Sequence, residues 1–424
     1  MYTGKRIHDA LTGQDLTRRN MLRTAACSAI ALGGWAFSMR ARAEGEQGSS
    51  LSTDITGDEI LLSAIRPLLA SSRRVAVAVI EPGRAPRFAG FGADENTEFE
   101  IGSVTKTFTG ALLMDAVNNG VLTLDMSVQD ILGDTAAGSA IANVRLGELA
   151  SHTSGLPYVP VSMIRDILDK VAPGLANANA REVEQIAYAP NGFSGIPESL
   201  LSPKQVAAIL NGNPFAPYTP EDVIQHALDS SLAGRGTFRY SNLGVALQGH
   251  LIGIAQNDTW RTLLSDRVLD PLCLFHTWCP ETEEELYAET GGSPMIGTAP
   301  DGKPASPWPC RGYAPDGIMR STAADLARYL NHLIETPDPA AAGLIPVVRN
   351  ASNQSAVAVN WLMDLTANES DPVYMHTGET GGFSSLCVFQ RKSRRGVVAL
   401  SATRGDGMAL NAVAERAMGG SIPA

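Results

Sequence analysis

Positive charge is scarce in this sequence. Only six of its 424 residues are lysine, and the formal net charge at pH 7 is −11. Nucleic acids and anionic membranes attract proteins largely through clusters of positive charge. We therefore expect no nucleic-acid partner, and no attachment to an anionic membrane through charge.

An apolar run of the length that crosses a bilayer, about 20 residues, is also absent. The stretch "TAACSAIALGGWAFSM" has about 16 residues; it follows the adjacent Arg18 and Arg19 and precedes "ARAE". A charged segment, a short apolar segment and an A-x-A site together predict a cleaved signal peptide over residues 1–43, of the twin-arginine type. The alternative is an N-terminal membrane anchor, for which the run is short. We expect a periplasmic or secreted protein without a stable membrane span after cleavage.

Cysteine is rare, and no two cysteines form a C-x-x-C pair, so the sequence gives little support to a zinc or redox site. No histidine spacing suggests a metal site, and we expect neither metal nor cofactor. Export to an oxidising compartment favours one disulfide. Cys279 and Cys310 are the candidate pair, because both lie next to prolines in loop-like sequence.

Patterns typical of strands stand at both ends of the chain, and patterns typical of helices lie between them. "RRVAVAVIEPG" and "PRFAGFG" near the start, and "VYMHTGE", "SSLCVF" and "GVVALS" near the end, predict strands. This order predicts an α/β fold, in which an antiparallel sheet built from both chain ends is flanked by helices. We expect the α/β part at about residues 55–110 and 310–424, and a mostly helical insertion at about residues 111–309.

The stretch "FEIGSVTKTFTG" places Ser103 three residues before Lys106, at the start of a predicted helix. Residues three apart on a helix share one face. A serine hydroxyl is a poor nucleophile unless a base activates it, and a buried lysine that has lost its proton can be that base. The other interpretation is a helix cap at Ser103 and a solvated Lys106, and this motif alone leaves both open.

Two later stretches complete a pattern. "FRYSNLG" contains a Y-x-N motif, and "MHTGETGGF" contains His-Thr-Gly. In this order the three motifs resemble the serine β-lactamase and penicillin-binding protein superfamily. The branch most similar contains class C β-lactamases, D-alanyl-D-alanine carboxypeptidases and related esterases. The resemblance covers the chain from about Val75 to Arg404, and it implies one domain of this fold over residues 44–424.

The resemblance implies three catalytic residues. Ser103 would attack a carbonyl and become acylated, and Lys106 would take or share its proton. Tyr240 would work with Lys106 as general base and then protonate the leaving nitrogen. That role requires a tyrosine whose pKa is lowered by nearby cations, here Lys106 and His376.

The resemblance also implies a set of substrate-binding residues. Asn242 would donate to a substrate carbonyl, His376 and Thr377 would hold a substrate carboxylate, and Gly378 would let the strand pass close to the ligand. With His376 in place of the lysine of many β-lactamases, the hold on a carboxylate would weaken as pH rises. The backbone N–H of Glu379 would join that of Ser103 in an oxyanion hole.

The glutamate side chain at position 379 is unexpected. It either points away from the cleft or opposes an anionic substrate. His152, in "ASHTSG", could suggest a catalytic triad with Ser103, but its place at a helix end favours a structural role in capping carbonyls.

The predicted function is therefore an exported serine hydrolase that works through an acyl-enzyme. Its substrates would be β-lactams or the D-alanyl-D-alanine stems of peptidoglycan. The alternatives are a carboxylesterase with the same residues and a penicillin-binding sensor that does not turn over. The sequence leaves open the natural substrate and the oligomeric state.

Overall fold

The computed structural model describes residues 55–69, 72, 74–171, 180–188, 202–350, 354–366 and 368–419. The predicted signal peptide, residues 1–43, lies outside the described residues.

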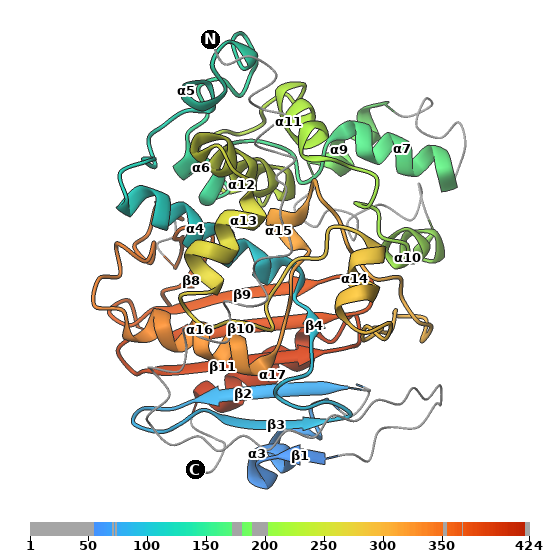
Figure 1. Ribbon diagram of the computed structural model, residues 1–424, viewed down its shortest axis with the longest axis vertical. Coiled ribbons are helices and arrows are strands. Elements are labelled where there is room, and N and C mark those ends of the chain that lie inside the picture. The colour runs from blue at the N-terminus through green and yellow to red at the C-terminus, as the bar shows by residue number, and fades with distance from the viewer. Residues whose placement is uncertain are drawn as a thin grey trace.

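Nine strands of the described chain form one antiparallel sheet in the order β1-β3-β2-β11-β10-β9-β8-β7-β6 (Figure 1). The two ends of the chain meet in its middle, where β2 pairs with β11 and Val77 lies opposite Ala399. The predicted fold class is thus confirmed. The strands are β1 (Ile55–Gly57), β2 (Val75–Ile80), β3 (Arg87–Phe91), β6 (Val348–Arg349), β7 (Ser355–Val357), β8 (Leu362–Asp364), β9 (Val373–Glu379), β10 (Ser384–Gln390) and β11 (Arg395–Ser401). A separate pair joins β4 (Phe99–Glu100) to β5 (Arg320–Ser321).

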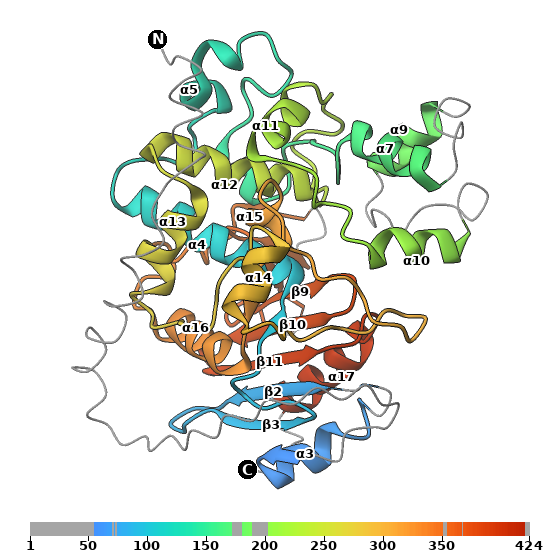
Figure 2. The same ribbon diagram turned by 45° about the vertical axis from the view of Figure 1, so that its right-hand side comes forward.

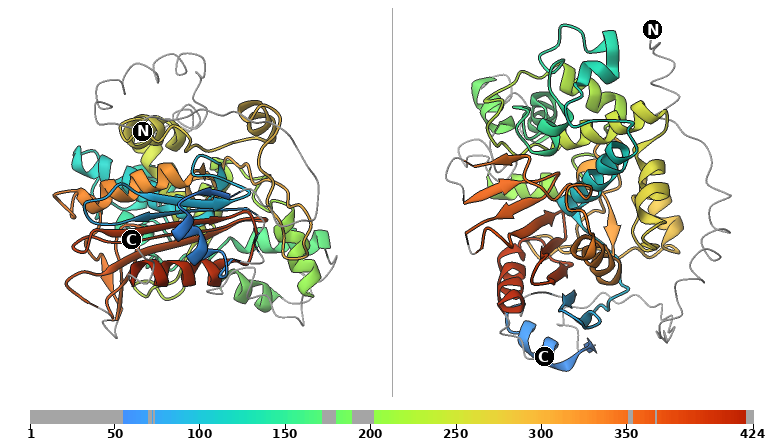
Figure 3. Two further views of the ribbon diagram at one scale, coloured as in Figure 1. Left: turned by 90° about the horizontal axis from the view of Figure 1, so that it is seen from below. Right: turned by 90° about the vertical axis from the view of Figure 1, so that its left-hand side faces the viewer.

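Helices cover both faces of the sheet. Helix α16 (Ala323–Glu335) packs on one face, and α3 (Glu59–Ile65) and α17 (Gly407–Met418) pack on the other, as the edge-on view in Figure 3 shows for α16 and α17. Successive side chains of a strand point to opposite faces. In β2 the valines therefore join the core under α3 and α17, and the residues between them join the larger core. Burial on both faces explains why β2 is apolar throughout.

Helices make up most of the middle of the described chain. Several begin at a serine or threonine that caps the helix; Thr219, for example, caps α11 in a capping box with Asp222. The helices are α4 (Thr105–Asn118), α5 (Val128–Leu132), α6 (Leu146–Ala150), α7 (Val161–Val171), α9 (Ala180–Ala187), α10 (Pro203–Asn211), α11 (Pro220–Leu228), α12 (Asn242–Gln256), α13 (Trp260–Leu264), α14 (Glu283–Glu289) and α15 (Ala314–Gly317), with short turns η2 (Gly102–Val104), η3 (Gly133–Thr135) and η5 (Ser265–Leu269).

Helix α12 runs through the centre of this helical part, and α7, α9 and α10 gather at one side of it (Figure 2). In α12 the residues from Asn242 to Ile254 are all buried, which fits a helix whose sequence is mostly apolar around its whole circumference. Among the described residues we find no helix that combines the length and the apolarity needed to cross a membrane.

The predicted disulfide is not present in the structure. Cys279 and Cys310 are buried free thiols, and each is directed toward backbone carbonyls: the Cys310 thiol donates to the carbonyl of Phe215, at 3.0 Å. Burial raises the pKa of Cys310 to about 12, which keeps this thiol protonated.

Candidate active site

Ser103 lies on the short turn η2, which leads directly into α4. Its side chain does not cap α4, which begins after Val104. Strand β9 passes against this turn, and two glycines make the approach possible. A Cβ atom at Gly102 would lie 2.6 Å from the backbone nitrogen of Glu379, and one at Gly378 would lie 2.1 Å from the carbonyl oxygen of Ile101. The glycines therefore bring the end of β9 to the nucleophile candidate.

Lys106 is buried and reaches Ser103. Its Nζ lies 2.9 Å from the Ser103 Oγ, 2.6 Å from the backbone oxygen of Asp316 and 3.3 Å from the Asp316 Oδ2. Burial lowers the pKa of Lys106, and the nearby Asp316 charge opposes that shift. The interpretation of Lys106 as a solvated lysine is therefore wrong.

Asp316 is a residue that the sequence analysis missed. It belongs to the single turn α15, and its side chain is 4% exposed. Burial raises its pKa to about 6, although the Lys106 charge acts in the opposite direction. A lone aspartate in "APDG" carries no motif, and only the fold brings it beside a lysine 210 positions earlier in the chain.

Tyr240 faces both Ser103 and Lys106 from the residue before the N-cap of α12. Its ring centre lies 5.0 Å from the Lys106 Nζ, and Ser103 is close enough to the phenol to oppose the rise that burial causes in the Tyr240 pKa. The three predicted catalytic side chains thus meet in one place. The expected lowering of the Tyr240 pKa is wrong: burial raises this pKa, and the Asp316 carboxylate raises it further. The phenol of the free protein is therefore neutral.

The ring of His152 packs against the ring of Tyr240. Its ring lies 4.4 Å from the Tyr240 ring between centres, and its Nδ1 accepts the backbone N–H of Ser241 at 3.2 Å. The expected structural role holds, but it works through an acceptor nitrogen and not through the capping of carbonyls. Burial holds the pKa of His152 well below its usual value, with the charges of Lys106 and His376 acting in the same direction.

Asn242 pairs with Tyr158, which the sequence analysis did not assign to the site. The Tyr158 carbonyl accepts the backbone N–H of Asn242 at 2.9 Å, and the Asn242 side chain is close enough to the phenol to oppose the rise of the Tyr158 pKa. Burial raises the pKa of Tyr158 to about 12. Tyr158 comes three residues after the stretch "ASHTSG", and this closeness in sequence was the available signal.

The His-Thr-Gly motif lies in the second half of β9 and not at its start. His376 is buried, and burial followed by the Lys106 charge lowers its pKa to about 3. The expected charge change of His376 near neutral pH is therefore wrong. The neighbouring Thr377 is exposed, and neither His376 nor Thr377 is among the residues that line the pocket.

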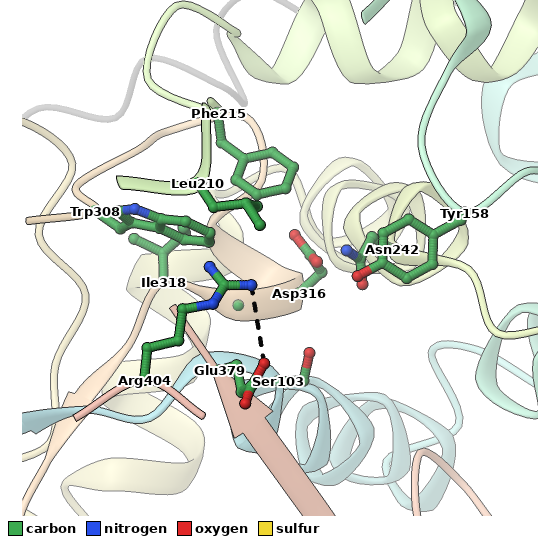
Figure 4. Close-up of a pocket in the computed structure, with 11 residues that line it drawn as sticks. Ser103, Tyr158, Leu210, Phe215, Asn242, Trp308, Asp316, Ile318, Glu379 and Arg404 are labelled. Carbon is green, nitrogen blue, oxygen red and sulfur yellow. Dashed lines mark ion pairs between the residues drawn. The ribbon is translucent and has the colours of Figure 1, made fainter. Parts of the chain in front are cut away.

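Glu379 does not point away from the site. Its side chain lines the pocket beside Ser103 and forms an ion pair with Arg404, with 3.8 Å between the Arg404 Nη2 and the Glu379 Oε2 (Figure 4). Arg404 follows β11 and also donates to the carbonyl of Thr380 at 3.2 Å. The sequence analysis had not assigned Arg404 to the site.

The pocket in front of Ser103 has an apolar wall and a polar wall (Figure 4). Its lining residues are Ser103, Tyr158, Leu210, Phe215, Asn242, Trp308, Asp316, Gly317, Ile318, Glu379 and Arg404. Within the described ranges, no three His, Cys, Asp or Glu side chains gather in a way that could hold a metal ion. The site can thus offer a hydroxyl, an amine, a phenol and an aromatic surface to a small substrate.

Comparisons with known proteins show the family of this chain. A family model described as Beta-lactamase matches residues 62–418. Penicillin-binding protein 4 of Amycolatopsis lactamdurans is 28% identical over 337 residues, which cover 75% of each chain. A beta-lactamase of Pseudomonas fluorescens is 27% identical over 392 residues, covering 82% of this chain and 94% of the relative.

Solved structures share the fold at lower identity. A class C beta-lactamase from Rhodobacter sphaeroides has a TM-score of 0.62 at 17% identity, covering 86% of this chain and 100% of its own. A beta-lactamase/D-alanine carboxypeptidase from Pseudomonas syringae has a TM-score of 0.62 at 16% identity, covering 86% and 99%. At these identities the likeness concerns the fold alone.

Proposed function

The chain belongs to the Beta-lactamase family, and from this premise we propose that it hydrolyses amides or esters through an acyl-enzyme on Ser103. One observation carries the proposal: a fully buried lysine nitrogen lies 2.9 Å from the Ser103 hydroxyl. Burial favours the neutral amine, which is the form that can accept a proton.

In the proposed acylation, the Ser103 oxygen bonds to the substrate carbonyl carbon while its proton passes to the neutral amine of Lys106. Tyr240 then gives its phenolic proton to the departing nitrogen or oxygen as that bond breaks, and Lys106 returns a proton to Tyr240. Because its pKa is raised, Tyr240 is protonated in the free protein and has no phenolate to accept the Ser103 proton, so we assign the base to Lys106. General acid–base catalysis of this kind contributes about 10²–10⁴-fold.

The negative charge on the carbonyl oxygen would be held by the backbone N–H groups of Ser103 and Glu379. The close approach that Gly102 and Gly378 permit supports this assignment. Such donors are worth about 10²–10³-fold in rate each. Water then attacks the acyl-enzyme with the same proton transfers, which frees Ser103.

The names of the relatives make β-lactams and D-alanyl-D-alanine peptides the first substrate candidates. The Glu379–Arg404 pair favours a second candidate, a carboxylesterase, because it places a carboxylate in the pocket. We place the activity outside the cytoplasm on the basis of the predicted signal peptide.

The test combines a fluorescent penicillin label with three substrates: nitrocefin, a D-alanyl-D-alanine peptide and a p-nitrophenyl ester. We expect Ser103→Ala to lose labelling and all hydrolysis, and Ser63→Ala, at an exposed serine of α3, to keep both. Hydrolysis by Ser103→Ala at the wild-type rate would show that another residue is the nucleophile. A label that persists without any turnover would indicate a sensor.

A further inference from the structure

Both cations at the pocket of the described chain already have a carboxylate partner. Lys106 lies 3.3 Å from Asp316, and Arg404 lies 3.8 Å from Glu379. Figure 4 shows Asp316, Glu379 and Arg404 around the space in front of Ser103. A substrate carboxylate would therefore meet an arginine whose charge Glu379 already balances, and a buried lysine that favours its neutral form.

The histidines near the site add no positive charge. His376 and His152 are buried close to Lys106, and burial together with that charge lowers the pKa of each. Both imidazoles are neutral at physiological pH. The position that the family motif gives to a carboxylate-holding cation is thus uncharged in this protein.

Within the outer pair, the carboxylate is the more accessible partner. The Glu379 side chain is 43% exposed and the Arg404 side chain 11%. An approaching ligand therefore meets the glutamate before the guanidinium. Like charges placed together oppose binding strongly and are a common means of rejecting a wrong partner.

We propose that this site takes acyl donors without a carboxylate beside the scissile bond, and that the Glu379 side chain sets this preference. The inference rests on the proposed function and narrows its substrate class to neutral esters and amides. Phe215, Trp308 and Leu210 form an apolar wall suited to an uncharged acyl or leaving group.

For a neutral ester the step balances without another reactant. The Ser103 oxygen forms a bond to the acyl carbon, the ester C–O bond breaks, and the leaving oxygen takes a proton from Tyr240. Water then cleaves the acyl-enzyme, giving a carboxylic acid and the free hydroxyl of Ser103.

The test uses two esters of one arylacetic acid whose leaving groups are 3-hydroxybenzoate, which is anionic, and its methyl ester, which is neutral and larger by one methyl group. The measurement is the ratio of kcat/KM for the neutral ester to that for the anionic ester. We expect the wild-type ratio to favour the neutral ester by about ten- to a hundredfold. Glu379→Gln should reduce the ratio about tenfold, and Arg404→Gln should increase it.

Glu284→Gln, at an exposed glutamate of α14 that does not line the pocket, makes the same charge change and should keep the wild-type ratio. A wild-type ratio of one or less, or a ratio that Glu379→Gln does not change, overturns the inference while leaving the proposed hydrolase intact. Failure to hydrolyse either ester, together with no labelling of Ser103, overturns both.

Discussion

Two pairs of an acidic and a basic side chain lie at the site, and they differ in how deeply they are buried. This difference gives each pair a different role. Lys106 and Asp316 are 0% and 4% exposed, whereas Arg404 and Glu379 are 11% and 43% exposed. In the buried pair, desolvation moves both pKa values toward the neutral forms, so the pair acts on proton transfer. The outer pair is partly solvated and faces the substrate, so it acts on recognition. An acid–base pair thus assists proton transfer where it is buried, and influences the choice of substrate where it is partly exposed.

The largest expected effect comes from breaking the buried pair. Lys106→Met removes the proposed base, and hydrolysis should fall by about 10²–10⁴-fold. It also leaves Asp316 without its partner, and breaking a buried pair in this way costs about 3–5 kcal/mol of unfolding free energy. Urea denaturation measures the second effect.

Arg404→Met is the matched variant for the outer pair. Because Glu379 can be solvated, the loss of unfolding free energy should stay below about 1 kcal/mol. Equal losses in the two variants would show that burial does not distinguish the pairs. The double variant Lys106→Met/Asp316→Asn tests the cause of this loss. If it recovers much of the stability that Lys106→Met loses, the unpaired Asp316 carboxylate is the cause.

A second prediction concerns stability as a function of pH. The pKa of Asp316 is about 6 in the folded protein against 3.8 for the free side chain, so its contribution to stability is complete below pH 3.8 and is lost as pH rises through 6. Relative to Asp316→Asn, which cannot titrate, the wild type should lose about 3 kcal/mol of unfolding free energy between pH 3.5 and 7. Chemical denaturation of both proteins across this range measures the difference.

Lys106, whose pKa burial lowers, also faces Asp316 and is present in both proteins. Four further titratable groups near Asp316 do not change charge in this range. Burial raises the pKa of each, so they stay protonated; they are Tyr158, Tyr240, Tyr313 and Cys310. A difference between the two proteins that stays constant with pH would mean that Asp316 keeps an ordinary pKa.

A third prediction uses Asp316→Asn to identify the general base from the pH dependence of kcat/KM. The Asp316 charge raises the pKa of Lys106, so Asp316→Asn should lower that pKa further. If neutral Lys106 is the base, the acidic limb of kcat/KM then moves to lower pH. Glu379→Gln should move this limb less, because its carboxylate is exposed and more distant from the amine. An acidic limb that stays in place in Asp316→Asn argues for a base other than Lys106.

The sequence was sufficient for the fold and for the ordered motifs. Strand periodicity at both chain ends predicted the sheet, and the resemblance carried by the S-x-x-K and Y-x-N motifs implied which side chains meet at Ser103. These features are local or repeat a known pattern. The structure then brings Ser103, Lys106 and Tyr240 together, as the motifs indicated.

The electrostatics of the site were not predictable from the sequence. Whether a lysine, tyrosine or histidine is charged depends on what buries it, and burial comes from segments far away in the chain. Asp316 and Arg404 belong to no motif, yet they decide the partners of Lys106 and Glu379. The predictions for Tyr240 and His376 failed for this reason, since each assumed a solvated or cation-dominated environment.

The smallest expected effect concerns His376. It tests whether the charge of this side chain is set by its burial or follows the expectation from the His-Thr-Gly motif. A solvated imidazole changes charge near pH 6.5, whereas the pKa of His376 is lowered to about 3 by burial and by the Lys106 charge. Its NMR signals, assigned by comparison with His376→Gln, should show no titration between pH 5 and 8. A titration midpoint within that range would mean that His376 can carry a positive charge and bind a substrate carboxylate. That result would argue against a site that accepts only neutral acyl donors.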